Sequence, residues 1–208
     1  MIDEQAELLP VKKGFFFVLD GIDGCGKSLH SRILSDELRR EGYKTVRTTE
    51  PSNGIVGQFI KSAILQSRKV SPEIEVLLFA ADRFDHLNRE VLPLLERGII
   101  VISDRYVHAS LAYQGAQDVS VDWIRQVNSF AIKPDLSIYL DVRPEIGLRR
   151  KRGRPSVLET LELQRKVRDA FLTLVASGEM VAVDANGPIG QVKRRILSLA
   201  LDFLKHTG

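Results

Sequence analysis

The sequence is poor in cysteine, because Cys25 is the only one among 208 residues. An internal disulfide is therefore excluded, and a reducing cytoplasm is the expected compartment. The chain also lacks any apolar run near the roughly 18 residues that a membrane-spanning helix needs, so we expect no membrane partner. The first fourteen residues carry Asp3, Glu4 and Glu7 before any basic residue, an order unlike that of a secretory or transit peptide. We expect residues 1–14 to form a short tail.

The composition is that of one soluble globular domain. Hydrophobic residues make up 44% of the chain and charged residues 27%. A chain of 208 residues is long enough for one well-packed α/β domain and too short for two comfortable ones, so we expect a single domain over residues 15–208. The formal net charge of +3 is modest, and its local excess lies in R-R-K-R-G-R at residues 149–154. Such a cluster could bind nucleic acid, or it could be a solvated helix end.

A phosphate-binding loop is the clearest motif in the chain. The unbroken apolar run from Phe15 to Leu19 has the length and aromatic content of a strand buried on both faces, and it leads directly into G-x-x-x-x-G-K-S at residues 21–28. The glycines let the backbone turn so that successive N–H groups converge on phosphate oxygens at the start of the next helix. Lys27 can then reach the terminal phosphates of a nucleotide, and the Ser28 hydroxyl can ligate Mg2+.

Strands and helices alternate along the whole chain. Strands are expected at residues 15–19, 43–48, 99–103, 136–141 and 179–184. Helices are expected at 28–41, 55–65, 71–97, 108–114, 121–132, from 144 into the basic cluster, at 156–176 and from 188 onward. This alternation predicts a five-stranded parallel sheet covered by helices on both faces, the three-layer α/β/α fold of P-loop NTPases. Ligands of such a fold bind at the carboxyl ends of the strands.

Asp104 and Arg105 follow the third predicted strand directly. P-loop enzymes hold a carboxylate over the magnesium ion at this position, and an adjacent guanidinium can grip a phosphate with two hydrogen bonds. The two residues could instead simply pair with each other at a strand end. Other charged groups are expected at the same edge of the sheet, which favours the functional interpretation.

Phe79 and Arg83 lie four residues apart on a predicted helix and therefore share one face. An aromatic ring beside a guanidinium suits an acceptor base, because the ring can stack on the heterocycle while arginine donates to a carbonyl. Taken alone, the same pair is more often a core residue and a surface charge.

The basic cluster at residues 149–154 has a third interpretation. It follows the fourth predicted strand, and glycine and proline interrupt its helix. In a phosphotransferase, a mobile flap at this place can close over the transferred phosphoryl group, and its guanidinium groups then neutralise the charge on the phosphoryl oxygens.

Taken together, these motifs resemble those of the thymidylate kinases. The segments L-D-G-I-D-G-C-G-K-S, T-E-P, F-A-A-D-R, D-R-Y, A-S-L-A-Y-Q-G and P-D-L-S-I-Y-L-D-V occur in the family's order, and the similarity runs from Phe15 to about Val192. The resemblance implies transfer of the γ-phosphoryl group of ATP to dTMP, giving dTDP and ADP with Mg2+. It also implies a short basic lid near residues 149–156 and a homodimer packed through helices. Neither nucleic acid nor membrane is expected as a partner.

The resemblance assigns roles to individual residues. Phe79 would stack on thymine, Arg83 would donate to its O4, Arg105 would hold the acceptor phosphate, and Tyr113 would crowd the ribose 2′ position. The residues implied to bind ATP are Gly21, Ile22, Asp23, Gly24, Cys25, Gly26, Lys27 and Ser28; those implied to bind dTMP are Asp23, Glu50, Phe79, Arg83, Arg105, Ser110, Tyr113 and Gln114; those implied in catalysis are Lys27, Asp23, Arg105, Arg149, Arg150 and Arg152; the metal would be held by Ser28 and Asp104.

The chain departs from the family pattern at several positions. Many relatives have arginine where Thr49 stands, and glutamate is frequent in place of Asp20. Some members carry an arginine inside the phosphate loop, whereas this loop has none. The chain therefore resembles the arrangement in which lid arginines supply the charge.

Two alternatives stay open on the sequence alone. The chain could be another deoxynucleoside or nucleoside monophosphate kinase, or a P-loop nucleotide-binding module without kinase activity. A GTPase switch is not expected, because the chain contains neither N-K-x-D nor T-K-x-D. No obvious catalytic histidine is found among His30, His86, His108 and His206, but a phosphate acceptor with a second pKa of about 6 is mostly dianionic at neutral pH and needs no proton removed. His108 is nearest the predicted site, and we expect it to pack or to lie at the surface.

Overall fold

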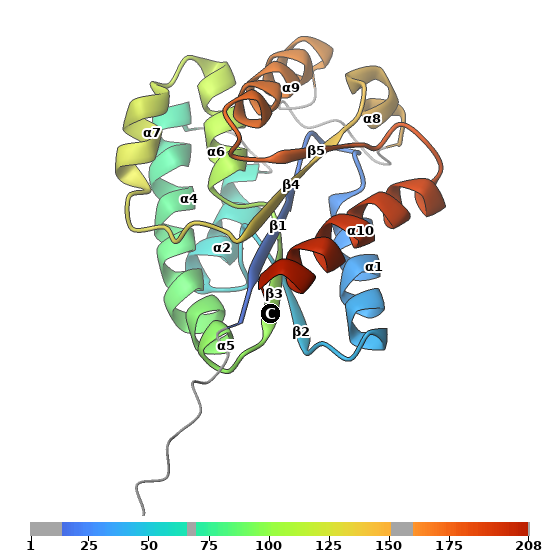
Figure 1. Cartoon of the computed structure of the whole chain (residues 1–208). Coiled ribbons are helices and arrows are strands. Elements are labelled where there is room, and N and C mark those ends of the chain that lie inside the picture. Colours follow the sequence, from blue (N-terminus) through green and yellow to red (C-terminus); the bar gives the residue numbers. More distant parts are fainter. Residues whose placement is uncertain (1–13, 66–69, 151–159, 208) are drawn as a thin grey trace, which may run out of the picture.

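The computed structural model describes residues 14–65, 70–150 and 160–207. In these residues five parallel strands form one sheet in the order β2-β3-β1-β4-β5, visible at the centre of Figure 1. The strands are β1 (Phe16–Asp20), β2 (Thr45–Thr49), β3 (Ile100–Asp104), β4 (Leu136–Asp141) and β5 (Val181–Asp184). The predicted five-stranded parallel sheet is confirmed.

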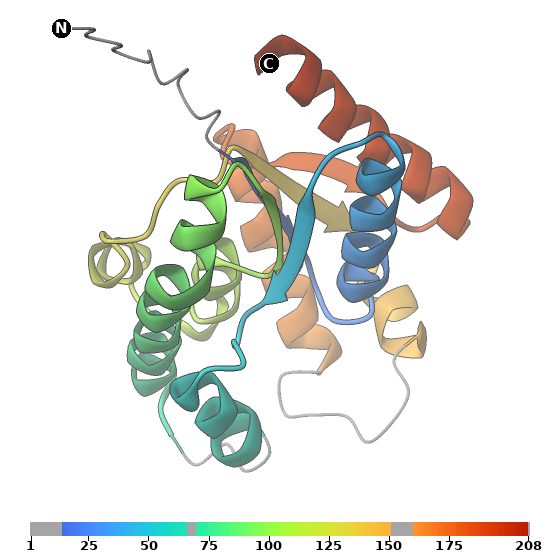
Figure 2. The same cartoon turned by 90° about the horizontal axis from the view of Figure 1, so that it is seen from below.

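Helices cover both faces of this sheet, so the predicted three layers are confirmed as well (Figures 1 and 2). One face carries α1 (Lys27–Arg40) and α10 (Ile189–Thr207), which pack on each other. The opposite layer and the edges contain α2 (Ile55–Phe59), η1 (Ile60–Ile64), α4 (Pro72–His86), η2 (Leu87–Val91), α5 (Leu92–Glu96), α6 (Val107–Tyr113), η3 (Gly115–Gln117), α7 (Val121–Val127), α8 (Pro144–Arg150) and α9 (Leu161–Ala176).

The central strand determines where the site lies. All five residues of β1 are buried, as expected for a strand covered on both faces. The strand pairs with β3 on one side and β4 on the other, and Leu19 lies opposite Asp104. Because the pairing is parallel, the loop that leaves β1 and the residues that follow β3 come out at the same edge of the sheet.

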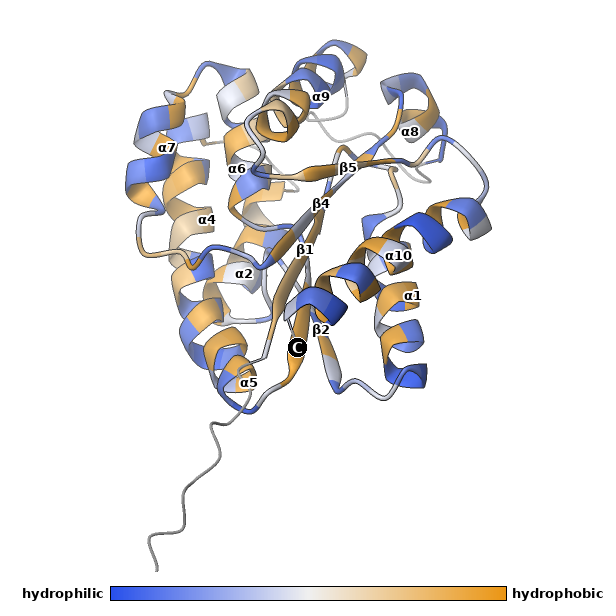
Figure 3. Cartoon of the chain, in the orientation of Figure 1, coloured by the Kyte–Doolittle hydropathy of each residue, from blue (hydrophilic) through white to orange (hydrophobic). Residues whose placement is uncertain are grey.

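Burial of apolar side chains holds the layers together. Figure 3 shows apolar residues along the strands and on the inner sides of the helices, with polar residues outside. In the core, Phe171 of α9 stacks on Tyr139 of β4 with ring centroids 4.9 Å apart. None of the helices in the described part of the chain is long and apolar enough to cross a membrane.

The helix predicted for residues 71–97 is continuous from 72 to 96 but contains a π-helical turn at η2. Pro93 explains this turn. Proline has no N–H to donate to the carbonyl four residues earlier, and its ring clashes with that carbonyl, so the preceding turn widens. The predicted helix is therefore confirmed, and its π-helical turn was not predicted.

The start of the helix predicted for residues 156–176 is wrong. The described helix α9 begins at Leu161, and Thr160 is in extended conformation, with its hydroxyl accepting a hydrogen bond from the Leu163 N–H. Thr160 is therefore the N-cap. The predicted cap, Ser156, lies outside the described residues, as do Arg152 of the predicted lid and the tail up to residue 13.

Two glycines bring helix α8 against the loop that follows β1. A Cβ on Gly24 would lie 2.0 Å from the carbonyl oxygen of Gly147, and a Cβ on Gly147 would lie 2.6 Å from the carbonyl oxygen of Asp23. Both obstacles are backbone atoms, which cannot turn aside as a side chain can. The two segments are therefore in backbone contact that only glycine permits.

This contact predicts that Gly147→Ala destabilises the protein although alanine favours helices. The added methyl group forces backbone apart, and overpacking of this kind costs about 1–3 kcal/mol. The matched control is Gly190→Ala in α10, where a Cβ would meet nothing within 4 Å; that variant should keep the wild-type stability or gain up to about 1 kcal/mol. Urea unfolding measures both. Equal stabilities of the two variants would contradict the predicted contact.

Candidate active site

The segment from Gly21 to Ser28 leaves β1 and runs into the first turn of α1, as the sequence predicts. Gly24 and Gly26 adopt φ values of 76° and 97°, which side chains rarely allow. Lys27 lies back over the loop, where its Nζ donates to the carbonyl oxygens of Gly21 at 2.9 Å and Ile22 at 3.0 Å. The loop therefore forms an amide-lined turn at a helix N-terminus, with an ammonium group above it, a ready site for phosphate.

The predicted metal ligands meet beside this loop. The Ser28 hydroxyl donates to the carboxylate of Asp104 at the end of β3. A hydroxyl and a carboxylate oxygen are the hard ligands that Mg2+ prefers, and P-loop enzymes complete its shell with phosphates and water. The described residues hold no cluster of three or more His, Cys, Asp or Glu side chains that would bind a metal without a nucleotide. The donor set therefore fits Mg2+ brought with a nucleotide.

Arg105 reaches from β3 to the loop. Its guanidinium forms an ion pair with Asp23 and lies 5.0 Å above the ring of Tyr113. Its backbone has φ of 77°, a value uncommon for a residue with a side chain. Hydrogen bonds fix this conformation, because Arg105 N–H donates to Leu19 O and the Ser103 hydroxyl donates to Arg105 O at 2.7 Å. Strain held in this way at a charged residue is common at functional sites.

Asp20 connects the loop that follows β1 to the segment that follows β3. Its fully buried carboxylate accepts from the N–H of Gly21 at 2.9 Å and from the N–H of Tyr106 at 3.3 Å. Burial raises the pKa of Asp20 to about 6, against the opposing effect of Arg105 and Lys27. One carboxylate thus holds both the start of the phosphate loop and the residue after Arg105.

Arg83 of α4, which the sequence predicts to contact an acceptor base, is the centre of a buried polar cluster. Its side chain is 2% exposed and forms an ion pair with Glu50, with Nη2 2.8 Å and Nε 2.9 Å from the same carboxylate oxygen. Nη1 donates to Asn128, and Nη2 lies 3.4 Å from the hydroxyl of Ser110. The guanidinium carbon lies 5.3 Å from the ring centre of Tyr106. Phe79, one turn earlier on the same helix, is half-buried.

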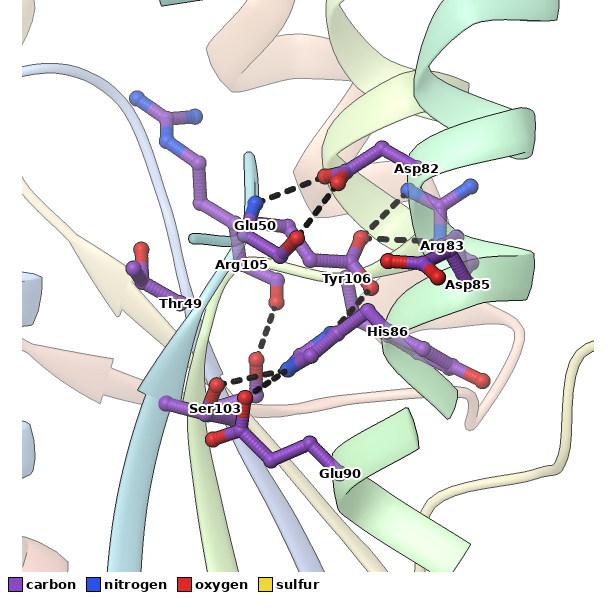
Figure 4. A network of polar contacts seen from close by, with 12 residues as sticks. Thr49, Glu50, Asp82, Arg83, Asp85, His86, Glu90, Ser103, Arg105 and Tyr106 are labelled. Carbon is purple, nitrogen blue, oxygen red and sulfur yellow. Dashed lines mark hydrogen bonds and ion pairs between the residues drawn. The ribbon is translucent and has the colours of Figure 1, made fainter. Parts of the chain in front are cut away.

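The structure gives Glu50 and Gln114 immediate partners within the protein. Glu50 was expected to touch an acceptor nucleotide, but its carboxylate lies between Arg83 and His86 (Figure 4). Gln114 donates to Glu75 at 3.0 Å and is buried. Both side chains are therefore buried and paired with other protein groups in this structure.

The lid arginines are only partly brought to the site. Arg149 donates to the Glu145 carbonyl of its own helix. Arg150 donates to the carbonyl oxygens of Ala185 at 2.9 Å and Asn186 at 3.0 Å, in the turn between β5 and α10. In this structure both guanidinium groups are therefore bound to backbone carbonyls rather than directed at the phosphate loop.

Several polar residues of the site were missed by the sequence reasoning. Asp82 accepts from the Ser52 N–H and hydroxyl at 2.7 and 2.6 Å, and Gln164 of α9 accepts from the Asp23 N–H at 3.3 Å. His86 lies 3.3 Å from Glu50. Asp82 and His86 share a helix face with Phe79 and Arg83, and this spacing was a usable signal. Nothing in the sequence around Gln164 or Asn128 pointed to the site.

His108 is buried, as expected for packing. Burial lowers the pKa of His108 to about 4, and its Nδ1 has no hydrogen-bond partner among the described residues. The imidazole is therefore neutral at physiological pH and supplies no proton near the loop.

The fold and this edge of the sheet define a nucleoside monophosphate kinase of the P-loop class, a phosphotransferase. The family model of thymidylate kinase matches residues 19–196. A probable thymidylate kinase of Staphylothermus marinus is 42% identical over 194 residues, which is 92% of this chain and 96% of that protein. Those of Pyrococcus abyssi and Caldivirga maquilingensis are 41% and 40% identical, over 90% and 91% of this chain and 96% and 95% of their own length. The chain belongs to the thymidylate kinase family.

The buried carboxylate of Asp20 predicts a pH dependence of stability. Its folded pKa of about 6 lies above the unfolded value of 3.8, so the folded protein binds the proton more tightly. Stability therefore falls as pH rises through this window, and the loss is complete above pH 6. In Asp20→Asn this titration is absent. The stability of the variant relative to wild type should rise by roughly 2–3 kcal/mol between pH 4 and pH 7.

Urea unfolding of both proteins at several pH values measures this difference. Asp184→Asn is the opposite control, because hydrogen bonds from Asn186 hold the pKa of the exposed Asp184 below its usual value. The relative stability of that variant should fall, not rise, as pH increases. Parallel profiles for Asp20→Asn and wild type would show that the Asp20 carboxyl is not perturbed in the folded protein.

Proposed function

We propose that the protein transfers the γ-phosphoryl group of ATP to dTMP and forms dTDP and ADP. The single observation that carries the proposal is the ion pair of Arg105 with Asp23, which joins a guanidinium at the end of β3 to the phosphate loop at the end of β1. A donor phosphate on the loop and an acceptor phosphate on Arg105 would meet there. Membership of the thymidylate kinase family supports thymine as the base, and the guanidinium of Arg83, oriented by its ion pair with Glu50, is the group proposed to contact it.

The donor side works by positioning. The amides of Gly21–Ser28 hold the β- and γ-phosphates, and Lys27 moves from the carbonyl oxygens of Gly21 and Ile22 to the phosphate oxygens. Ser28 and Asp104 would hold Mg2+, which neutralises charge on the phosphates when it is bound with ATP. The acceptor phosphate is mostly dianionic above its second pKa of about 6 and attacks without a general base.

The acceptor side selects the nucleotide. Phe79 stacks on the base, and Arg83 donates to O4 of thymine, a carbonyl that cytosine replaces with an amino group. Ser110 and Gln114 lie at the base, and Tyr113 beneath Arg105 excludes a ribose 2′-hydroxyl. Glu50 would orient Arg83 through their ion pair rather than contact the nucleotide itself. Arg149, Arg150 and Arg152 of the lid would turn toward the phosphoryl group when both nucleotides are bound, releasing the carbonyl contacts of Arg149 and Arg150.

The chain is further proposed to act as a homodimer. Three large apolar side chains of α4, Ile74, Leu77 and Phe84, are 45%, 51% and 56% exposed. Ile55 and Phe59 of α2, a helix that packs on α4, are also exposed. Several large apolar side chains exposed on two packed helices are typical of a protein interface. The same helix carries Phe79 and Arg83 toward the acceptor pocket, so a partner would buttress the site from behind.

Loss of either phosphate contact should abolish turnover. Lys27→Ala and Arg105→Ala each remove a cation from the reacting phosphates, and kcat should fall by at least about a hundredfold. A coupled assay of ADP release with ATP, Mg2+ and each of the common nucleoside monophosphates measures this. Wild type should use dTMP best.

Lys44→Ala and Arg47→Ala, at exposed positions away from the loop, are the matched controls and should keep the wild-type rate. Unchanged rates for both site variants would reject the mechanism, and ADP release without an acceptor preference would favour another kinase activity.

Replacing one apolar residue of the α4 surface by a charge should separate the protomers. Leu77→Asp buries a carboxylate in the proposed interface and should convert a dimer of about twice 23.3 kDa into a monomer, as measured by light scattering after gel filtration. Ile189→Asp is the control, since Ile189 is equally exposed at the start of α10. A wild-type protein that elutes as a monomer at micromolar concentration would overturn the dimer.

A further inference from the structure

His86 is completely buried, and its two ring nitrogens have polar partners on β2 and in the loop after it. Nδ1 lies 3.3 Å from Glu50 Oε1, and Nε2 lies 2.6 Å from the hydroxyl of Thr48. Figure 4 shows the imidazole below Glu50, on the side away from Arg83. An N–H at Nδ1 can donate to the Glu50 carboxylate, and Nε2 shares the second hydrogen bond of the ring with the Thr48 hydroxyl. Glu90, 3.9 Å from Nε2, is the other charged group that faces the ring.

Glu50 is therefore held from both ends. One carboxylate oxygen faces His86, and the other receives Nε and Nη2 of Arg83. A carboxylate with only the guanidinium as a partner could rotate about its last bond; the imidazole removes this freedom. His86 thus contributes to fixing the plane of the Glu50 carboxylate, on which Nε and Nη2 of Arg83 converge.

The contacts of Arg83 with the described residues account for four of its five N–H groups. Arginine has five N–H groups. Among the described residues, Nε–H goes to Glu50, the two hydrogens of Nη2 face Glu50 and Ser110, and one hydrogen of Nη1 goes to Asn128. The remaining N–H is on Nη1. Its direction depends on the plane of the whole guanidinium, because the group is rigid.

From these contacts we infer that His86 is a positioning residue for recognition of the acceptor base. It acts through Glu50, which orients Arg83 so that its last N–H meets a carbonyl of the base. His86 touches neither substrate nor phosphate, and its effect is on the choice between acceptors rather than on phosphoryl transfer. The inference rests on the proposed function, in which Arg83 reads O4 of thymine.

The test compares two acceptors that differ at this carbonyl. The ratio of kcat/KM for dTMP to kcat/KM for dCMP is measured for wild type, His86→Leu and His86→Asn. Leucine removes the bond to Glu50, and the ratio should fall about tenfold, the equivalent of one hydrogen bond to a charged group. Asparagine can place an amide N–H near the position of Nδ1, so His86→Asn should recover most of the wild-type ratio. A merely structural histidine would lower both rates together and leave the ratio unchanged.

Two controls make the result decisive. His108→Leu removes another buried histidine, one whose Nδ1 has no partner in the described part of the chain, and should leave the ratio unchanged. If His86→Leu does not fold, Thr48→Val tests the same hydrogen-bonded series from Thr48 through His86 to Glu50. This variant removes only the hydroxyl bonded to Nε2, and the ratio should fall about threefold. The neighbouring Thr49→Val, whose hydroxyl bonds the Asp104 carbonyl, should not change it.

Arg83→Gln separates the inference from the proposed function. If wild type does not prefer dTMP to dCMP, the proposed function itself is wrong. If wild type prefers dTMP and Arg83→Gln abolishes the preference, while His86→Leu or Thr48→Val keeps it, the positioning role is overturned and the function stands. A preference that survives Arg83→Gln would overturn the positioning role as well, because Arg83 would not read the base.

Discussion

The parallel pairing of β1 with β3 is the constraint on which the site depends. It places Leu19 opposite Asp104, so the phosphate loop and Arg105 emerge side by side from the same edge. Hydrogen bonds then lock the two segments to each other, through the Asp20 carboxylate and through the N–H of Arg105 on Leu19. Two cationic groups, Lys27 and Arg105, are thereby fixed close together before any phosphate arrives. Such preorganisation spares the reaction the cost of gathering charge at the moment of transfer.

A second buried network gives the acceptor side its rigidity. Arg83, Glu50 and His86 are nearly inaccessible to solvent, and burying a charged pair is costly unless every group finds a partner. The pair here is satisfied from four directions, by Asn128, Ser110, His86 and the ring of Tyr106. Removing Arg83 or Glu50 alone would leave an uncompensated buried charge, whereas an apolar pair of the same volume could be equally stable, so we regard the network as a device for geometry more than for stability. Its helix, α4, also carries the exposed apolar side chains Ile74, Leu77 and Phe84, so the proposed base recognition and the proposed dimer share one helix.

The sequence was sufficient for the fold and for the residues that follow β1 and β3, because short apolar strands, glycine spacing and a charged pair are local signals. It was insufficient where distant residues meet. Asn128 ends α7 earlier than the helix predicted to reach residue 132, since its side chain donates to the Ile124 carbonyl and accepts from Arg83. Glu50 was predicted to bind the acceptor, and its partners in the structure come from a helix more than thirty residues away. Two local details also escaped the sequence reasoning. The N-cap of α9 is Thr160 rather than Ser156, and the π-helical turn η2 precedes Pro93, and residue spacing alone predicts neither.

The most direct measurement of the central claim is a crystal structure of the protein with a non-hydrolysable ATP analogue, Mg2+ and dTMP bound together. The account predicts that the γ-phosphate lies on the amides of the phosphate loop, that the dTMP phosphate is held by Arg105, and that the two phosphates face each other beside Asp23. A structure in which the nucleotides bind far apart, or in which the pocket beside Arg83 stays empty at saturating dTMP, would contradict it.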